Sequence, residues 1–507
     1  MKPLAFAEQM RELDRSAIEG EHIPSLDLME QAALATTEEA MHFGQQMNVT
    51  IFCGPGNNGG DGVAAARLLL QRGCQVRTIL VGDREKMTHD ERAMEEKLIR
   101  AGGRLLPFAD LDDTEKTWMK SSDLMIDALF GVGLCRDVGG DFKTAVEWMN
   151  EAPCPVISCD IPSGISADTG DILGVAVKAD ETVTFTCPKP GLYLGDGAEY
   201  AGTVKIAPIG VPEHLIEEQM GNRAEQMTLV SEERDKFLPR RARTAHKGNF
   251  GKLFVLAGSE GYTGAPVLAS TAAVRAGAGL VFLGVPREVY PIVAVKCNEA
   301  MPYPLPEDYS AILKKARGCD VALIGPGLGR KPETEKLVLS LLEDLEIPVV
   351  LDADGLNALS THIDVLDRRK NLTVLTPHDG EFQRLTGCAL PIRNRMKAAK
   401  DFARAHNCVM ILKGHGTVTA DPEGNVFIND SGNPGMARGG SGDVLSGILA
   451  AFLAQKQLGD DPARVCACGV YCHGLAGDRC AERLGEYGMT PTDMIGELPL
   501  VLKDYTC

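Results

Sequence analysis

The chain has 507 residues, which is too long for one ordinary hydrophobic core, so we expect two or more domains. Hydrophobic residues make up 44% of it and charged residues 24%, a composition typical of globular rather than disordered proteins. The formal net charge of −18 argues against nucleic acid as a partner, because a phosphate backbone would repel the protein.

The first half of the chain begins with two predicted helices, over residues 7–18 and 25–41, where apolar residues recur at helical spacing. Residues 1–15 lack the basic start and apolar core of a secretory signal, and no apolar run could cross a bilayer. We therefore expect a cytoplasmic protein without a membrane partner. Short apolar runs then alternate with helices, as in a doubly wound α/β domain. They predict strands at 49–53, 76–81, 123–128, 155–159, 182–186 and 203–207.

Three of these strands end in polar, glycine-rich loops, at residues 54–62, 127–133 and 160–164. Because ligands of open α/β sheets sit at the carboxyl ends of the strands, we expect the three loops to converge on one site. Oxygens of Asn58, Asp127 and Ser163 could enclose a hard cation. Asp160 would then be a free carboxylate for proton transfer. A structural turn explains each loop taken singly.

Between residues 208 and 238 the alternation decays into a polar stretch, which we interpret as a linker. A second α/β series follows it, so we predict two unrelated α/β domains, over residues 1–220 and 226–507. The second series has predicted strands at 252–257, 280–285, 321–324, 348–351, 373–375 and 409–412, and a hairpin over 416–428.

The second half carries the motif Gly439-Gly440-Ser441-Gly442-Asp443. Apolar residues at helical spacing from Val444 onward place it at a helix N-terminus, where free backbone N–H groups attract anions. An acid among such donors is well placed to take a proton from a nucleophile that approaches a phosphate, although a helix cap also explains Asp443. Lys413-Gly414-His415-Gly416-Thr417 adds a cation and bare backbone amides. Together with the strand ends at 258–266, 325–329, 352–354 and 376–381, these motifs outline a nucleotide-phosphate site with one acid.

The fifteen cysteines are an odd number scattered along the chain, which suits reduced thiols rather than a disulfide framework. The tightest group lacks paired CxxC units and lies in an Ala/Val-rich helical stretch. We therefore predict buried small residues rather than a metal site. The group comprises Cys466, Cys468, Cys472 and Cys480.

These motifs resemble a known family over nearly the whole chain. The loops at 54–62, 127–134 and 160–164 resemble those of the NAD(P)HX epimerases, whose fold is Rossmann-like. The motifs at 261–266, 376–378, 413–417 and 439–443 resemble those of the NAD(P)HX dehydratases of the ribokinase-like superfamily. In this order they match the bacterial bifunctional nicotinamide-nucleotide repair enzymes. The resemblance implies that the first domain interconverts the R and S hydrates of NADH or NADPH and the second removes water from the S form.

The resemblance also implies a role for each matching residue. Asp160 would be the acid/base of epimerisation, and Asn58, Asp127 and Ser163 would bind potassium. Asp443 would take the proton of the hydroxyl group that is removed. Hydrate contacts are implied for Asn57, Asn58, Gly59, Gly60, Asp61, Gly131, Val132, Gly133, Leu134, Cys135, Arg136, Asp137 and Asp160 in the first domain, and for Ala265, Gly327, His378 and Asp443 in the second. ADP contacts are implied for Lys413, Gly414, His415, Gly416, Thr417 and Gly442.

From the same resemblance we expect K⁺ in the epimerase domain, ADP as co-substrate with ATP as the alternative, Mg²⁺ in the dehydratase domain, and a homo-oligomer. Gln31 and Ala33 depart from the Asn and Gly that are more usual in the family, and Ser441 stands where many ribokinase-like kinases have Thr. Two other readings stay open on the residues alone. One is a ribokinase-like small-molecule kinase, acting on hydroxymethylpyrimidine or a sugar, and the other is a nucleotide-binding sensor without turnover.

Overall fold

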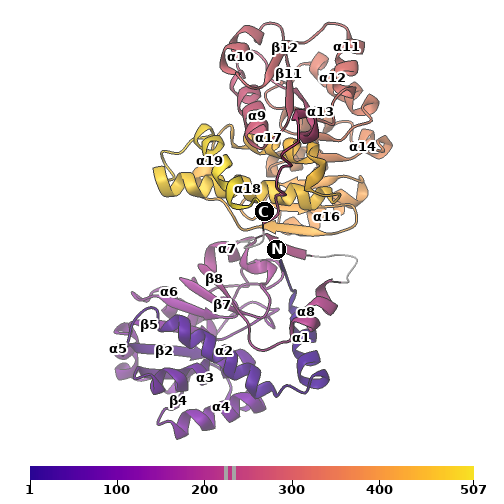
Figure 1. Ribbon diagram of the computed structural model, residues 1–507. Helices are drawn as coiled ribbons and strands as arrows, with labels where there is room; N and C mark the ends of the chain where they lie inside the picture. Colours follow the sequence, from indigo (N-terminus) through magenta and orange to yellow (C-terminus); the bar gives the residue numbers. More distant parts are fainter. Residues whose placement is uncertain (222–226, 231–235) are drawn as a thin grey trace. The chain divides into compact units, whose positions relative to one another are not determined.

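The computed structural model describes residues 1–221, 227–230 and 236–507. The chain divides into two compact units, Lys2–Arg223 and Ala224–Cys507, the latter joined by Met1 (Figure 1). Both units are α/β, as the sequence predicts, and each is built on its own largely parallel sheet.

The first unit contains a wholly parallel sheet with the strand order β4-β3-β2-β5-β6-β7-β8. The chain starts at β2 in the middle, builds outward to one edge and then returns to build the other half. The order therefore reverses next to β2, which is where ligand sites form in such sheets. The strands are β2 (Asn48–Cys53), β3 (Gln75–Leu80), β4 (Leu105–Pro107), β5 (Leu124–Ala128), β6 (Val156–Cys159), β7 (Glu181–Phe185) and β8 (Thr203–Ala207), after the short β1 (Lys2–Pro3).

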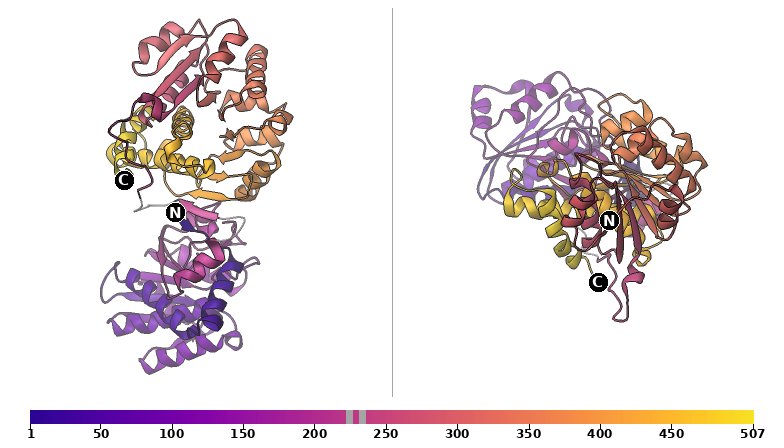
Figure 2. Two further views of the ribbon diagram at one scale, coloured as in Figure 1. Left: turned by 45° about the vertical axis from the view of Figure 1, so that its right-hand side comes forward. Right: turned by 90° about the horizontal axis from the view of Figure 1, so that it is seen from above.

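Helices cover both faces of this sheet (Figure 2). Because side chains alternate along a strand, Ile51 packs under helices on one face while its neighbour Phe52 packs on the other. Strands β5 and β6 are buried throughout, which explains their continuous apolar runs. The helices are α1 (Ala7–Arg15), extended by a π-helical turn (Ser16–Gly20), α2 (Ser25–Ala40), α3 (Asn57–Gln71), α4 (His89–Arg100), α5 (Asp113–Lys120), α6 (Asp141–Asn150), α7 (Gly197–Tyr200) and α8 (Glu213–Ile216).

Helix α3 begins six residues before the predicted start at Val63. Asn57, Asn58 and Asp61 therefore belong to its first turns and not to a loop. The glycines of this segment allow the early start, because a Cβ on Gly59 would lie 1.8 Å from the carbonyl oxygen of Gly54. The segment packs too tightly for any larger residue.

In the second unit the sheet runs β9-β18-β17-β16-β15-β14-β13-β10-β11-β12. The pairs from β16 to β12 are parallel, and β17 forms antiparallel pairs with β16 and β18, so the predicted hairpin is confirmed. The strands are β9 (Met227–Val230), β10 (Lys252–Leu256), β11 (Leu280–Val285), β12 (Met301–Pro304), β13 (Val321–Ile324), β14 (Val349–Leu351), β15 (Thr373–Leu375), β16 (Val409–Leu412), β17 (Val418–Ala420) and β18 (Val426–Asn429).

The interpretation of residues 208–238 as a linker is wrong in part. Residues 213–221 are helical in the first unit, and β9 pairs with β18 of the second sheet. The polar residues around 222–226 lie outside the described residues. A strand of four residues among polar residues is too short to show an alternating pattern of apolar and polar residues, so the sequence does not predict it.

The core of the second unit lies between the sheet and the helices α9, α17, α18 and α19. Helix α17 lies beside α9, and its small residues permit close approach, since a Cβ on Gly447 would meet the Ala269 carbonyl oxygen at 2.2 Å. The helices are α9 (Gly264–Arg275), α10 (Tyr290–Lys296), α11 (Tyr309–Arg317), α12 (Pro332–Asp344), α13 (Asp354–Leu359), α14 (Asp364–Arg368), α15 (Asp379–Thr386), α16 (Arg395–Ala405), α17 (Ser441–Ala454), α18 (Pro462–Leu484) and α19 (Pro491–Asp504).

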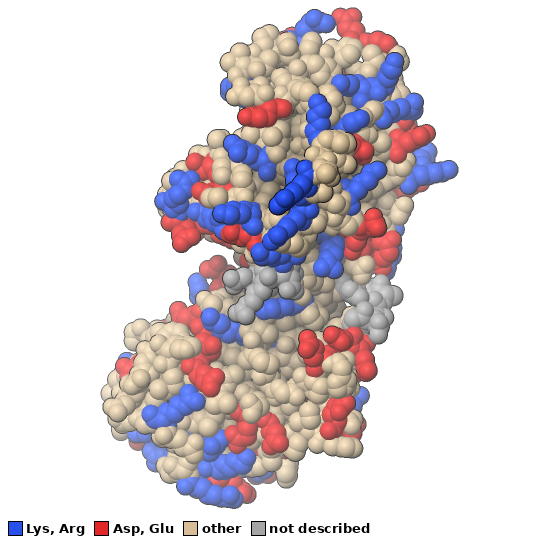
Figure 3. Space-filling model, in the orientation of Figure 1, with Lys and Arg blue, Asp and Glu red and all other residues tan. Residues whose placement is uncertain are grey.

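All fifteen cysteines are free thiols, and the four in α18 are buried in the core, as predicted. In the described part of the chain, no cluster of His, Cys, Asp and Glu could hold a metal ion by itself. The same residues contain no helix long and apolar enough to span a membrane. Figure 3 shows Lys and Arg interspersed with Asp and Glu over the face it presents, so the negative charge is spread rather than gathered.

Candidate active sites

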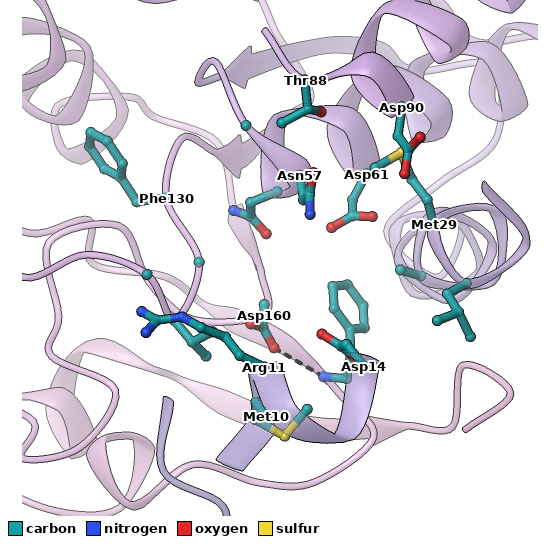
Figure 4. Close-up of a pocket in the computed structure, with 18 of the residues that line it drawn as sticks. Met10, Arg11, Asp14, Met29, Asn57, Asp61, Thr88, Asp90, Phe130 and Asp160 are labelled. Carbon is teal, nitrogen blue, oxygen red and sulfur yellow. Dashed lines mark hydrogen bonds between the residues drawn. The ribbon is translucent and has the colours of Figure 1, made fainter. Parts of the chain in front are cut away.

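A cavity of about 750 Å³ opens at the carboxyl edge of the first sheet (Figure 4). It is lined by the start of α3, the loop after β5 and the end of β6, so the three predicted loops do converge. Helices α1 and α2 supply the opposite wall. The predicted residues that line it are Asn57, Asn58, Asp61, Gly131, Val132, Gly133, Leu134, Cys135, Arg136 and Asp160.

Two of the other predicted contacts face the protein instead. Gly59 and Gly60 are buried in the first turn of α3, where a Cβ on Gly60 would lie 2.6 Å from the Met29 side chain. Asp137 is not among the described residues that line the cavity. The two glycines therefore allow the close packing at the start of the helix, and their neighbours Asn57, Asn58 and Asp61 are the residues that line the cavity.

Asp160 follows β6 in a left-handed backbone conformation, with a φ of 68°. The carboxylate is free in part only, because the fully buried Lys189 donates to its Oδ1 at 2.5 Å. The Phe185 amide also donates to Oδ1, at 3.2 Å. One oxygen is thus anchored beside a positive charge. Lys189 lies in a Pro-Lys-Pro stretch that carries no motif signal, so sequence reasoning missed it.

Two further carboxyl groups face the same cavity. Figure 4 shows Asp61 on one side and Asp14 with Asp160 on the other. Burial raises the pKa of Asp14 to about 6, with the charge of Asp160 adding to the rise and Lys189 opposing it. Burial and the charge of Asp160 also raise the pKa of Asp61 well above its usual range. The cavity therefore combines one ion-paired carboxylate with two acids that hold their protons more tightly than usual.

Two of the predicted cation ligands, Asp127 and Ser163, are in direct contact, and the third, Asn58, lines the cavity. Asp127 is completely buried and accepts hydrogen bonds from Ser158 and from both the backbone and hydroxyl of Ser163, at 2.6 to 2.8 Å. Burial raises its pKa, while the hydrogen bonds from Ser163 lower it. The side-chain amide of Asn58 has a buried atom, Nδ2, without a hydrogen-bond partner among the described residues. A hard cation would need the oxygens of these side chains, namely the Asp127 carboxylate, the Ser163 hydroxyl and the amide Oδ1 of Asn58, because Nδ2 is a donor and cannot bind it.

Glu91 anchors the glycine-rich segment from α4. Its Oε2 accepts a hydrogen bond of 2.9 Å from the Gly56 amide, just before α3 begins. Burial raises the pKa of Glu91 to about 7. No motif marks this residue, since its partner is a backbone group thirty-five positions away.

The second site lies where α17 begins, near the carboxyl ends of β14 and β16. Lys413, directly after β16, donates to Asp352 Oδ1 at 2.8 Å and lies 3.7 Å from Glu381 Oε2. Burial lowers the pKa of Lys413, but Asp352 and Glu381 outweigh it and raise the net value. A Cβ on Gly442 would lie 3.3 Å from Lys413 Nζ, so the predicted ADP contacts Lys413 and Gly442 are neighbours.

Asp443, in the first turn of α17, is surrounded by these charges. Burial raises its pKa to about 7, with Asp352 adding to the rise and Lys413 opposing it. A carboxyl with a pKa near neutrality can take and release a proton under ordinary conditions. The helix-cap reading is not supported, because Gly440, in a left-handed conformation, is the cap residue and Asp443 is the third residue of the helix.

The remaining predicted residues surround this centre. Gly327 has a φ of 64°, and a Cβ there would meet that of Ala265 at 2.9 Å, so these two lie in contact. Gly414 and His415 are exposed, which leaves their backbone open to a ligand, and Thr417 closes the turn by donating to the Gly414 carbonyl. His378 caps α15, where its Nδ1 accepts from the Gly380 amide at 3.0 Å. Its imidazole is thus partly committed to structure.

Behind α17, the buried His473 supports the glycine-rich turn. Its Nε2 donates to the Ser441 carbonyl at 3.0 Å. Burial lowers the pKa of His473 to about 4, so the imidazole is neutral near pH 7. Sequence reasoning missed this contact because it joins residues thirty-two positions apart.

Comparisons with known proteins cover both units. Residues 25–191 match the family described as YjeF-related protein N-terminus, and residues 253–500 match the NAD(P)H-hydrate dehydratase family. The chain is 41% identical over 518 residues to the bifunctional NAD(P)H-hydrate repair enzyme Nnr of Moorella thermoacetica, covering 99% of this chain and 97% of that protein. Its identity to the Escherichia coli protein of the same name is 34% over 502 residues, covering 98% and 93%.

Among solved structures, an ADP/ATP-dependent NAD(P)H-hydrate dehydratase from Bacillus subtilis, co-crystallised with ATP and Mg²⁺, is 30% identical. The match covers 53% of this chain and 94% of that one, with a TM-score of 0.46.

Proposed function

This chain belongs to the family of bifunctional NAD(P)H-hydrate repair enzymes, with an epimerase domain followed by a dehydratase domain, and we propose how its residues share the two reactions. The first domain interconverts the R and S hydrates, which carry a hydroxyl group at C6 of the nicotinamide ring. The second removes water from the S hydrate at the expense of ADP, giving AMP and phosphate. The main support is the 41% identity that spans both domains of the Moorella relative.

Dehydration needs a better leaving group than hydroxide, which leaves poorly near neutral pH. Asp443 takes the proton of the C6 hydroxyl as the terminal phosphoryl group of ADP transfers to that oxygen. Phosphate then leaves C6 with the bonding electron pair, C5 loses a proton to the solvent, and the ring regains its C5–C6 double bond. The pKa of Asp443, raised by burial to about 7, supports this role, since a base works best with a pKa near the working pH.

The nucleotide binds along the loop from Lys413 to Thr417 and at the start of α17. Lys413 and the first N–H groups of that helix offer positive charge to phosphate oxygens. Ala265, Gly327 and His378 contact the hydrate. The carboxylate of Asp352 is a hard oxygen donor of the kind that would hold Mg²⁺ together with substrate phosphates. ATP is the alternative donor, and the assay below separates the two nucleotides.

In the first domain, Asp160 acts as acid/base on the hydrate, which contacts the start of α3 and the loop after β5. K⁺ would be held by Asn58, Asp127 and Ser163, where it would fix the loops that line the cavity. The buried carboxyl of Asp127, its direct contact with the Ser163 hydroxyl and the position of Asn58 on the cavity wall support this assignment.

The decisive experiment incubates mixed R and S hydrates with the full chain, potassium and either ADP or ATP. We expect complete recovery of the absorbance of the reduced nicotinamide ring with ADP, and one AMP per ring restored. Without nucleotide, only the ratio of R to S should change. A stable phosphorylated product would favour a small-molecule kinase instead, and tight ADP binding without turnover would favour a nucleotide sensor.

A further inference from the structure

A carboxyl group from the N-terminal helix faces the epimerase cavity without any structural task. Asp14 lies on α1, before residue 25, where the match to the N-terminal family begins. It lines the cavity, and among the described residues it forms no hydrogen bond or ion pair. Sequence reasoning gave Asp14 no role.

Even exposed acids of the same unit form hydrogen bonds that stabilise its structure. Asp112 caps α5 by accepting from the Thr114 and Glu115 amides. Asp123 accepts from the backbone of Asn48, and Asp180 accepts from that of Val156, each at 2.8 Å. Asp14 does nothing comparable, although it sits in an unfavourable place for a carboxylate, beside Asp160. An uncompensated acid at a cavity wall suggests a role toward the ligand.

The charges around Asp14 and Asp160 differ. Lys189 forms an ion pair with Asp160, whereas Asp14 has no such partner among the described residues, and burial and the charge of Asp160 raise the pKa of Asp14. The other ionisable groups that face or flank Asp14 are Asp61 on α3, Arg11 on α1 and the Cys187 thiol after β7. Two carboxyl groups at one cavity in different environments, one ion-paired and one without a partner, are a usual arrangement for one base and one acid.

We propose that Asp14 is the general acid of epimerisation and works together with Asp160 as the base, an inference that rests on the proposed function. The substrate carbon C6 carries both a hydroxyl group and the ring nitrogen N1. Asp160 removes the hydroxyl proton, the C6–N1 bond breaks with its electron pair going to nitrogen, and Asp14 protonates N1. The open form is an aldehyde, which turns about the C5–C6 bond.

Ring closure reverses these transfers on the other face of the aldehyde. N1 attacks the carbonyl carbon, Asp14 takes back the N–H proton, and Asp160 returns its proton to the new hydroxyl oxygen. No proton is gained or lost over the cycle, and no oxidant or reductant is needed. Asp61 lies across the cavity, and burial and the charge of Asp160 raise its pKa too, so Asp61→Asn tests it as the alternative acid.

The test follows pure R hydrate as it approaches the mixture of R and S forms, with the full chain and potassium but no nucleotide, so that the dehydratase domain is idle. Asp14→Asn should slow this conversion on the order of a hundredfold or more at similar KM. Asp14→Glu should restore part of the rate. The wild-type rate should fall at alkaline pH, since deprotonated Asp14 has no proton to give, and Asp14→Asn should lose this limb of the profile.

Two controls separate the possible failures. Glu8→Gln removes an exposed carboxylate from the same helix and should leave the rate unchanged. Dehydration of pure S hydrate with ADP should stay normal in every variant, which shows that the second domain is intact, and an unchanged circular dichroism spectrum and urea unfolding of the first domain show that it is folded. If the wild type fails to convert R to S, the proposed function is wrong. If the wild type converts R to S but Asp14→Asn keeps its rate and pH profile, or changes KM alone, or if only Asp61→Asn removes activity, the role of Asp14 is refuted.

Discussion

The substitution Asp443→Asn tests two expectations together. The first is that Asp443 transfers a proton during dehydration, and the second is that its ionised carboxyl group destabilises the second domain. The amide keeps the size of the carboxyl group but cannot accept the hydroxyl proton. We expect turnover of S hydrate to fall on the order of a hundredfold or more, because proton transfer by a positioned side chain contributes about that much. ADP binding should persist, since Lys413 and the N-terminus of α17 remain in place.

The same substitution should stabilise the second domain at alkaline pH. Burial raises the pKa of Asp443 from 3.8 to about 7, so the folded state holds a proton that the unfolded state has lost. Stability is therefore lost as the pH rises from 3.8 toward 7. At about 1.4 kcal/mol per unit of pKa, ionised Asp443 costs the fold up to roughly 4 kcal/mol above pH 7. Asp443→Asn removes this cost.

The assay compares ADP-driven recovery of the reduced nicotinamide with urea unfolding of each variant at acid and alkaline pH. Asp460→Asn, an exposed site before α18, makes the same charge change and should alter neither measurement. Near-normal turnover in Asp443→Asn would refute the proton-transfer role. A loss of turnover together with a loss of stability at alkaline pH would contradict the electrostatic account, since a mere packing defect would then explain both.

Three further outcomes follow from individual contacts. Asp160→Ala should abolish R-to-S conversion while pure S hydrate is still dehydrated, and loss of both activities would contradict separate sites. Lys189→Met leaves Asp160 without its counter-ion, so R-to-S conversion should fall and the first domain should lose about 3 kcal/mol in urea unfolding; unchanged unfolding would count against the pair. Burial lowers the pKa of His473 from 6.5 to about 4, so the free energy of unfolding should fall by roughly 3 kcal/mol as the pH falls from 6.5 to 4. Circular dichroism during acid titration would show this loss. His473→Gln should flatten that dependence.

Much of the architecture can be predicted from the sequence. Parallel strands buried on both faces read as apolar runs, so most strands of both sheets lie within one or two residues of the prediction. The glycine-rich loops mark the strand ends because a backbone that approaches a ligand or another chain segment cannot carry a Cβ. The start of α3 and the strand β9 were missed for the opposite reason, since glycine and polar residues there carry no helical or alternating period.

By itself, the sequence determined the two-domain α/β plan, the loops that bear the candidate residues and the placement of Asp443 in the first turn of a helix, because these depend on local periodicity and on neighbours along the chain. Only the tertiary structure decided which charged side chains from distant parts of the chain lie close together. It sets Lys189 on Asp160, brings Asp14 from the N-terminal helix to the same cavity and surrounds Asp443 with Asp352 and Lys413. Protonation depends on burial and on charges a few ångströms away in space, and neither is encoded in any short stretch of sequence.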